Sequence, residues 1–285
     1  AGIKSPIMVL TAGTDSFEQI INYGLEPGIP NMYSLRILCE VLQKRGMSDF
    51  PIHIKLDTGM HRLGFMTEEM QELIDFLQTC KAVKVKSVYS HLAAADDPCC
   101  DDFTLGQVQL FRENADKLTA AIGYKPLYHI LNSAGIERFP QYQFDMVRLG
   151  IGIYGVSAIP GNHLSPVASF KCKILQIKTL QQSDGTIGSG RHGKIAPEGT
   201  VIATIPVGYA DGVDRHLSCG KGFFMVNGHK VPTIGNICMD MCMLDVTGID
   251  AKVGDTVTIF GEDPTITELA DILGISRQSI SKWES

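Results

Sequence analysis

The change of pattern near residue 160 constrains this chain more than any other feature of its sequence. Before it, short apolar runs alternate with amphipathic segments, and after Ser165 strand-like runs follow one another with turn residues between them. Alternating strands and helices are typical of a parallel sheet, because each parallel crossover usually contains a helix. We therefore expect an α/β fold that begins with an incomplete TIM-type β/α barrel over residues 1–160. A mostly β domain is expected over 161–274, with a divergent tail at 275–285.

Individual elements follow from the same patterns. Glu68–Thr79, with Thr67 as N-cap, is expected to be a helix because its apolar residues recur on one face. Asn227-Gly228 predicts a type I′ turn between two strands, and a helix is expected to return at Thr267–Leu273. The strands expected in the α/β part are Pro6–Leu10, Asn31–Ser34, Ile52–Leu56, Val85–Tyr89, Leu127–Leu131 and Met146–Ile151. Those expected in the β part are Phe170–Leu180, Val201–Val207, Gly222–Val226, Lys230–Ile234, Met241–Val246 and Thr256–Phe260.

The composition narrows the classes of protein that remain. With 44% hydrophobic and 20% charged residues, the chain has the composition of a folded protein rather than a disordered one. Its 25 Lys and Arg against 31 Asp and Glu give a net charge of −6, which disfavours nucleic-acid binding. No membrane span and no signal peptide are recognisable, so we expect a cytoplasmic setting without membrane contact. The eight cysteines lack the density of a disulfide scaffold and the spacing of a zinc site, so we expect buried thiols and no metal.

Polar side chains gather where the expected parallel strands end. In a β/α barrel these carboxyl ends and the loops after them form the functional rim. Taken singly, His91 is readily explained as a core histidine and Arg148 as a structural ion-pair partner, but groups from four strands together favour a site. Small residues at Ser133 and Gly150-Ile151 indicate a place for a phosphate. The rim residues are Lys55, Asp57, Arg62, His91, Asn132, Ser133, Arg148 and Gly150.

Six motifs in order resemble those of the bacterial alanine racemases, and together they span nearly the whole chain to Gly274. They are Lys55-Leu-Asp-Thr-Gly-Met-His-Arg-Leu-Gly64, Ser90-His91, Asn132-Ser133, Phe144-Asp-Met-Val-Arg-Leu-Gly-Ile151, Gly208-Tyr-Ala-Asp-Gly212 and Ile237-Cys-Met-Asp240. The resemblance implies a fold-type III enzyme that uses pyridoxal 5′-phosphate, with an eight-stranded barrel and a C-terminal β domain. It further implies an isomerase that interconverts L-alanine and D-alanine for peptidoglycan synthesis and works as a head-to-tail homodimer.

The resemblance also implies roles for individual residues. Arg148 would face the pyridine nitrogen, Arg62 would lie near the phenolic oxygen and the substrate, and His91 would join the hydrogen bonds behind Arg148. Tyr209 would be one of two catalytic bases, contributed across the dimer interface, and Lys55 occupies the position that is often carbamylated. The implied cofactor-binding residues are Asn132, Ser133, Arg148, Gly150 and Ile151, and those lining the partner's substrate pocket are Cys238, Met239 and Asp240.

The sequence departs from the family's pattern at its start. Nothing in it resembles the Lys-Ala-Asn-Ala-Tyr-Gly-type motif, whose lysine anchors the cofactor and serves as the second base. We therefore expect the chain to begin after the first two strand–helix units of the barrel. As given, it is expected not to racemise alanine, because inversion at Cα needs a base on each face of the substrate.

Further departures leave two alternatives open. Asn236 stands where many members have arginine, and Ser189 where many have tyrosine, so another substrate such as serine remains an alternative. Ile275–Glu284 replaces the family's usual Ile-Pro-Tyr-Glu segment, and Leu269–Glu284 resembles the helix-turn-helix core of repressors. A non-enzymatic remnant or fusion with such a tail is the second alternative. The acidic net charge and the lack of supporting helices predict no sequence-specific DNA binding.

Overall fold

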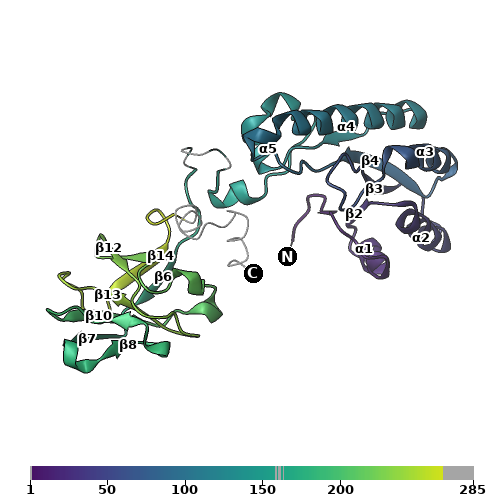
Figure 1. The fold of residues 1–285 in the computed structure, drawn as a ribbon. Coiled ribbons are helices and arrows are strands. Elements are labelled where there is room, and N and C mark those ends of the chain that lie inside the picture. The colour runs from purple at the N-terminus through teal and green to yellow at the C-terminus, as the bar shows by residue number, and fades with distance from the viewer. Residues whose placement is uncertain (1, 158, 160–161, 163, 266–285) are drawn as a thin grey trace. The chain divides into compact units, whose positions relative to one another are not determined.

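The computed structural model describes residues 2–157, 159, 162 and 164–265. It divides into two compact units (Figure 1). The N-terminal unit comprises Ala1–Gly150 with Ala158–Gly161, and the C-terminal unit comprises Ile151–Ser157 with Asn162–Ser285. The domain boundary at residue 160 stays a prediction, and the expected helix at Thr267–Leu273 and the tail at 275–285 lie outside the described residues.

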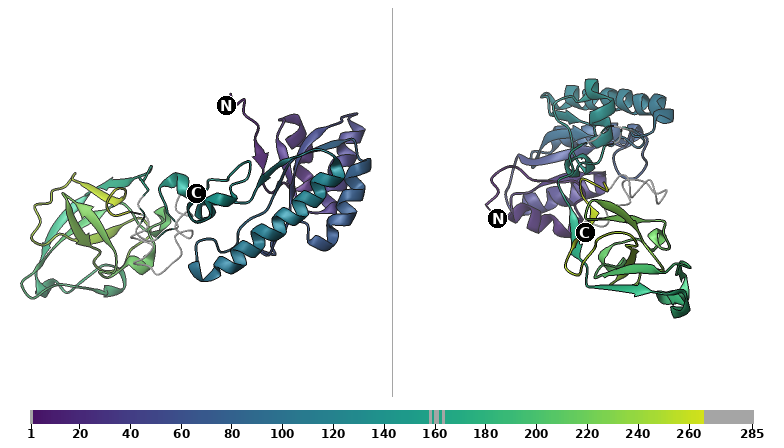
Figure 2. Two further views of the ribbon diagram at one scale, coloured as in Figure 1. Left: turned by 90° about the horizontal axis from the view of Figure 1, so that it is seen from above. Right: turned by 90° about the vertical axis from the view of Figure 1, so that its left-hand side faces the viewer.

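One parallel sheet forms the centre of the N-terminal unit, with its strands in chain order from β1 to β5. Helices α1 to α4 lie along one side of this sheet (Figures 1 and 2). This is the wall of an incomplete β/α barrel, and it confirms the expected fold class. The strands are β1 (Met8–Val9), β2 (Glu26–Ile29), β3 (Phe50–Lys55), β4 (Val83–Tyr89) and β5 (Leu127–His129). The helices are α1 (Phe17–Asn22), α2 (Met32–Lys44), α3 (Met70–Thr79), α4 (Asp101–Ile122) and α5 (Ser133–Arg138).

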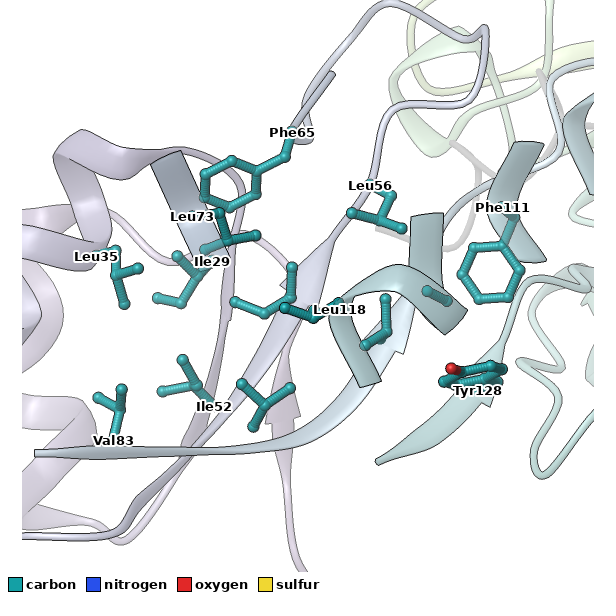
Figure 3. Close-up of a cluster of buried hydrophobic side chains, with 14 of the residues drawn as sticks. Ile29, Leu35, Ile52, Leu56, Phe65, Leu73, Val83, Phe111, Leu118 and Tyr128 are labelled. Atoms are coloured by element: carbon teal, nitrogen blue, oxygen red, sulfur yellow. The ribbon is translucent and has the colours of Figure 1, made fainter. Parts of the chain in front are cut away.

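The core of this unit lies between the sheet and its helices. Figure 3 shows apolar side chains from strands and helices packed into one cluster, among them Ile52, Leu73 and Phe111. The helix expected at Glu68–Thr79 is confirmed as a 3-10 turn, Thr67–Glu69, that continues into α3. Thr67 is not its N-cap, since the turn begins after Met66, whose backbone N–H donates to the Glu69 carboxylate at 2.8 Å.

In the N-terminal unit two expected strands are wrong and one strand went unpredicted. Asn31–Ser34 begins α2 instead, because the Asn31 side chain accepts a hydrogen bond from the Ser34 N–H at 2.9 Å and caps the helix. The strand is β2, five residues earlier, where Pro27 and Gly28 resemble the residues of a turn. A Cβ at Gly28 would lie 2.4 Å from the Tyr89 hydroxyl, so close packing requires glycine there.

The segment Met146–Ile151 is likewise not a strand. It runs beside the end of β5 and makes isolated backbone bonds, such as that from the Arg148 N–H to the Leu131 carbonyl at 3.0 Å. A regular ladder does not form, because the Tyr128 N–H donates to the Asp145 carboxylate at 2.9 Å instead of to a backbone carbonyl. The chain then continues into the 3-10 turn Ile151–Tyr154.

The C-terminal unit is mostly β, as expected, and its paired strands are antiparallel. Its sheets have the orders β13-β10-β7, β12-β11-β14-β6 and β8-β9. Asn227 and Gly228 both have positive φ, 50° and 78°, and join β11 to β12 in the expected hairpin. The strands are β6 (Phe170–Lys173), β7 (Gln176–Leu180), β8 (Thr186–Ile187), β9 (Gly193–Lys194), β10 (Thr200–Ile205), β11 (Phe223–Val226), β12 (His229–Pro232), β13 (Cys242–Asp245) and β14 (Thr256–Phe260).

The run expected as one strand at Phe170–Leu180 is divided between two sheets. Ile174 donates its backbone N–H to Asp255, beside β14, whereas Leu175 donates to Thr204 in β10. The chain therefore changes partner between these two residues, and β6 and β7 lie in different sheets. None of the helices within the described residues is long and apolar enough to cross a bilayer.

Candidate functional site

Three neighbouring strands of the N-terminal unit end in polar or aromatic residues at one rim. Lys55 ends β3, Tyr89 ends β4 and His129 ends β5. The Tyr89 and His129 rings are stacked with centroids 5.2 Å apart, and Lys55 Nζ lies 6.0 Å from the Tyr89 centroid. The Cζ atom of Arg148 lies 5.5 Å from the same ring, so Tyr89 has two cations beside it. Tyr89 was not predicted as a site residue, and neither was His129.

Arg148 is held firmly by neutral acceptors. Its Nη1 donates to His129 Nδ1 at 2.7 Å and to the His129 carbonyl at 3.2 Å, and its Nη2 donates to the carbonyls of Ser90 and Ile130. Burial lowers the pKa of Arg148 to about 10, still well above neutrality. Among the described residues no carboxylate pairs with this cation, and its Nε–H has no hydrogen-bond acceptor. Arg148 therefore offers a charge and a donor to a bound group.

The imidazole behind Arg148 is that of His129, which corrects the expectation for His91. The His91 ring makes no hydrogen bond among the described residues, and only its carbonyl is engaged, by Gln107 at 3.2 Å. Burial and the nearby charges of Arg148, Arg62 and Lys55 lower the pKa of His91 to about 4. His91 is therefore neutral near pH 7 and lies within the electrostatic reach of the same cations.

Lys55 is a buried amine in cationic surroundings. Burial is the main cause that lowers its pKa, and the charges of Arg62 and Arg148 lower it further, while Asp57 opposes them. A neutral amine is the form that acts as a nucleophile. The surrounding charges also favour any negative charge placed on Lys55.

The loop after β3 positions Arg62 through its backbone. Asp57 accepts hydrogen bonds from the N–H groups of Gly59 at 2.9 Å and His61 at 3.0 Å, which folds the loop over the end of the strand. A Cβ at Gly64 would lie 2.5 Å from the Asp57 nitrogen, so the return of the loop requires glycine. The Arg62 side chain is exposed, in contrast to Arg148.

The residues expected to hold a phosphate are only partly brought together. The Gly150 N–H donates to Ser133 Oγ at 3.0 Å, and Asn132 caps α5 by accepting from the Gly135 N–H at 3.0 Å. Ser133 is buried, and a Cβ at Gly150 would lie 3.7 Å from Ser133 Oγ. Ile151 is the first residue of the C-terminal unit.

Tyr209, Cys238, Met239 and Asp240 come together in the C-terminal unit. The Tyr209 N–H donates to the Cys238 carbonyl at 3.0 Å, and the next N–H donates to that of Met239 at 2.9 Å. The side chain of Tyr209 is 40% exposed, that of Met239 is 55% exposed, and Asp240 is exposed. Arg215 Cζ lies 5.4 Å from the Tyr209 ring centroid. The backbone of this corner is thus fixed, while its side chains face solvent.

The two departures from the family's pattern contact each other. Asn236 Nδ2 donates to the Ser189 carbonyl at 2.8 Å, and its Oδ1 lies 3.1 Å from His192 Nδ1. The short, neutral side chain of Asn236 thus joins two turns at a position where many members of the family have an arginine. Among residues 2–157, 159, 162 and 164–265, no three His, Cys, Asp or Glu side chains lie close enough to hold a metal ion.

A wall of parallel strands with a cationic rim, followed by an antiparallel unit, defines a barrel-type enzyme with an added β domain. The family model for the alanine racemase N-terminal domain matches residues 1–158, and that for the C-terminal domain matches residues 167–282. The chain belongs to the alanine racemase family.

Individual relatives agree with this assignment. An alanine racemase of Synechocystis is 35% identical over 100% of this chain and 77% of its own length. One from Clostridium kluyveri is 36% identical over 94% of this chain and 70% of its own. Among solved structures, an alanine racemase from Bartonella henselae with covalently bound pyridoxal phosphate is 27% identical over 98% of this chain and 77% of its own. It superimposes with a TM-score of 0.84.

Proposed function

We propose that the chain provides the cofactor site and one catalytic base of a cytoplasmic enzyme that interconverts L-alanine and D-alanine for peptidoglycan synthesis. The observation that carries the proposal is Arg148, a cation at the rim of a parallel sheet that is held only by neutral acceptors. Family membership supplies the reaction type. The eight free thiols fit a reducing cytoplasm.

The rim has the features that pyridoxal phosphate requires. Arg148 has a spare Nε–H for the pyridine nitrogen, and Ser133, Gly150 and Asn132 provide the small polar cradle for its phosphate, which Ile151 completes. When bound, the cofactor withdraws electrons from Cα and makes its proton acidic. A guanidinium does not give up its proton near neutrality, so Arg148 leaves the pyridine nitrogen unprotonated. That restrains side reactions, which suits a reaction confined to moving one proton.

Tyr209 is the base that this chain provides. In the homodimer we propose, Tyr209 serves the partner's site together with Cys238, Met239 and Asp240, which line the substrate pocket there. Arg215 Cζ lies 5.4 Å from the centroid of the Tyr209 ring, so a cation stands beside the proposed general base. On the N-terminal unit Arg62 contacts the cofactor's phenolic oxygen and the substrate, and His91 stays neutral beside it.

Lys55 is the residue we propose to be carbamylated. Its neutral amine would add to carbon dioxide and lose one proton, which forms a carbamate anion. Arg62 and Arg148 both favour a negative charge at that position. The carbamate would hold Arg62 against the cofactor.

The lysine that serves as second base is not recognisable in these 285 residues, so we propose that the chain by itself does not racemise alanine. To test this, the purified chain is incubated with pyridoxal phosphate, reduced with borohydride, and assayed for D-alanine and attached cofactor. We expect neither above background, and both when the chain is extended by a relative's lysine-bearing strands. Sustained D-alanine production with cofactor fixed to Lys4 or Lys55 would contradict this assignment.

The role of Tyr209 is tested in the extended chain. Tyr209→Phe is expected to lose racemisation by about 100-fold or more while cofactor absorbance is retained, because only a proton carrier is removed. Tyr23→Phe is the control, since Tyr23 is 78% exposed and lies in the other unit. Racemisation by Tyr209→Phe near the unmutated rate would remove Tyr209 from the mechanism.

We propose alanine as the substrate, with serine as the alternative, because Asn236 and Ser189 stand where many family members have an arginine and a tyrosine. Comparing alanine with serine in the same assay decides between them, and a larger kcat/KM for serine would favour the alternative. A mobility shift with a defined DNA site, lost in Arg277→Ala, would instead support a DNA-binding remnant.

A further inference from the structure

A chain of buried polar side chains crosses four neighbouring strands beneath Arg148. It consists of Glu26 in β2, His53 in β3, Ser87 in β4 and His129 in β5, and we name these four residues the polar chain. Their exposed fractions run from 0% for Ser87 and His129 to 8% for Glu26. Successive hydrogen bonds measure 3.0 Å, 2.6 Å and 2.9 Å, and the last link, to Arg148, measures 2.7 Å.

The chemistry of the groups gives every bond in the polar chain one direction. A guanidinium has only donors, so His129 Nδ1 must accept from Arg148 and the neutral ring carries its proton on Nε2. That proton goes to Ser87 Oγ, so the hydroxyl proton is left for His53 Nδ1. His53 then has its own proton on Nε2 and donates it to the Glu26 carboxylate, which has no proton to give.

The reverse arrangement is unfavourable. If His129 carried its proton on Nδ1, that N–H would point at an N–H of Arg148 at 2.7 Å. Protonating His129 fully has the same consequence, and burial together with Arg148 lowers the pKa of His129 to about 3. Burial also lowers the pKa of His53, although Glu26 opposes the effect. Both rings are therefore neutral at pH 7.

We infer that the polar chain is a positioning device for Arg148. Its members act through His129, whose Nδ1 lone pair they keep turned toward the guanidinium, and Glu26 is the fixed end that sets the direction. The inference rests on the proposed function only where it gives Arg148 a role toward the cofactor.

The placement of the carboxylate explains why three neutral groups intervene. Glu26 accepts from Lys86 Nζ at 2.6 Å and 2.9 Å, so its charge is balanced where it lies. A carboxylate directly beside Arg148 would also orient it, but would neutralise it as an ion pair. With the polar chain between them, Arg148 is oriented and keeps its positive charge available.

The tautomers of the two imidazoles test this inference without cofactor or substrate. The 285-residue chain is labelled with ¹⁵N-histidine, and long-range proton–nitrogen NMR correlations are recorded at pH 7. We expect His53 and His129 each to show a single neutral tautomer with the proton on Nε2. A proton on Nδ1 of either ring overturns the inference.

Ser87→Ala separates positioning from packing, because it removes only the central hydroxyl. His129 then loses the acceptor of its Nε2–H, so its ring nitrogen signals are expected to shift, while His53 keeps its tautomer through Glu26. In ¹⁵N-arginine spectra, Arg148 Nη1 and Nη2 are expected to exchange by rotation at least tenfold faster than in the unmutated chain.

Ser34→Ala is the matched control, because Ser34 in α2 is also buried but its hydroxyl donates to the carbonyl of Asn31, the N-cap of that helix. It is expected to change neither spectrum. Unchanged His129 and Arg148 signals in Ser87→Ala would refute the positioning role, and if that variant does not fold, the tautomers of the unmutated chain still decide. Since racemisation is not measured, a chain that shows these signals but lacks racemase activity after extension contradicts only the proposed function.

Discussion

The rim of the N-terminal unit and the Tyr209 corner of the C-terminal unit differ in how their side chains are held in place. Arg148 has its guanidinium held by four hydrogen bonds. Around Tyr209 the hydrogen bonds belong to the backbone, and the side chain is 40% exposed. The difference shows that one chain can combine a group whose orientation is fixed internally with a group that only a further surface would enclose.

Strand direction explains much of this contrast. In the parallel sheet, β3, β4 and β5 end side by side, so polar residues near their ends support one another from strand to strand. In the antiparallel unit neighbouring strands end at opposite edges, and Tyr209 lies in a short turn after β10. That turn is fixed by close backbone packing, so the two regions are expected to respond differently to substitution.

The largest effect is expected for Gly208→Ala. A Cβ there would lie 2.3 Å from the carbonyl oxygens of both Cys238 and Met239, so the backbone must move. We expect the free energy of unfolding, measured with urea, to fall by about 3 kcal/mol. Gly106→Ala in α4 is the control, because no atom lies within 4 Å of its added Cβ, and it should be neutral or stabilising. An unchanged urea midpoint for Gly208→Ala would show that the corner is not held by its backbone.

Arg148→Lys tests the internally held group. A lysine keeps the charge but cannot serve four acceptors spread over two guanidinium nitrogens, so buried carbonyls lose their donors. We expect a loss of about 2 kcal/mol in the same urea experiment. A variant as stable as the unmutated chain would mean that the hydrogen bonds of Arg148 contribute little net stability.

Acid should weaken the N-terminal unit through His129. This imidazole stays neutral in the folded chain down to its pKa of about 3, whereas in the unfolded chain it gains a proton near pH 6.5. The unfolded state therefore binds more protons between these values, and stability falls as the pH falls. Below pH 6.5 the loss approaches about 1.4 kcal/mol per pH unit for this group. Urea midpoints at pH 7.0 and 5.5 measure it, and His129→Asn should show a smaller difference.

The smallest effect is expected for Arg215→Ala. Its guanidinium lies over the Tyr209 ring in an exposed setting, where such a contact contributes less than about 1 kcal/mol. The urea midpoint of Arg215→Ala should therefore barely move from that of the unmutated chain. A large loss of stability would mean that the Arg215 side chain stabilises this corner although the contact is exposed.

Sequence reasoning located the residues that stand in recognisable motifs and missed those that support them. Lys55, Arg148 and Ser133 all stand in motifs that resemble those of the family. His53, Ser87 and Glu26 went unremarked, although a polar residue inside an apolar strand is itself a signal that a buried partner is needed.

The fold-level errors have a similar origin. β2 was missed because its Pro27 and Gly28 resemble a turn, and only the position of Tyr89 in three dimensions explains the glycine. His91 was preferred over His129 because it stands in a motif, whereas the contact with Arg148 depends on which strand lies beside it. Long-range neighbours of this kind are not encoded in local spacing.

The pairing of β6 with β14 has a consequence for the order in which the C-terminal unit is made. Lys173 of β6 donates to Thr256 of β14, which lies 83 positions later in the chain. During synthesis from the N-terminus, β6 emerges long before its partner, whereas the β11–β12 hairpin finds both of its strands at once. On the ribosome, β6 must therefore remain an unpaired edge until β14 has been translated, and during this interval nascent chains are exposed to pairing with one another.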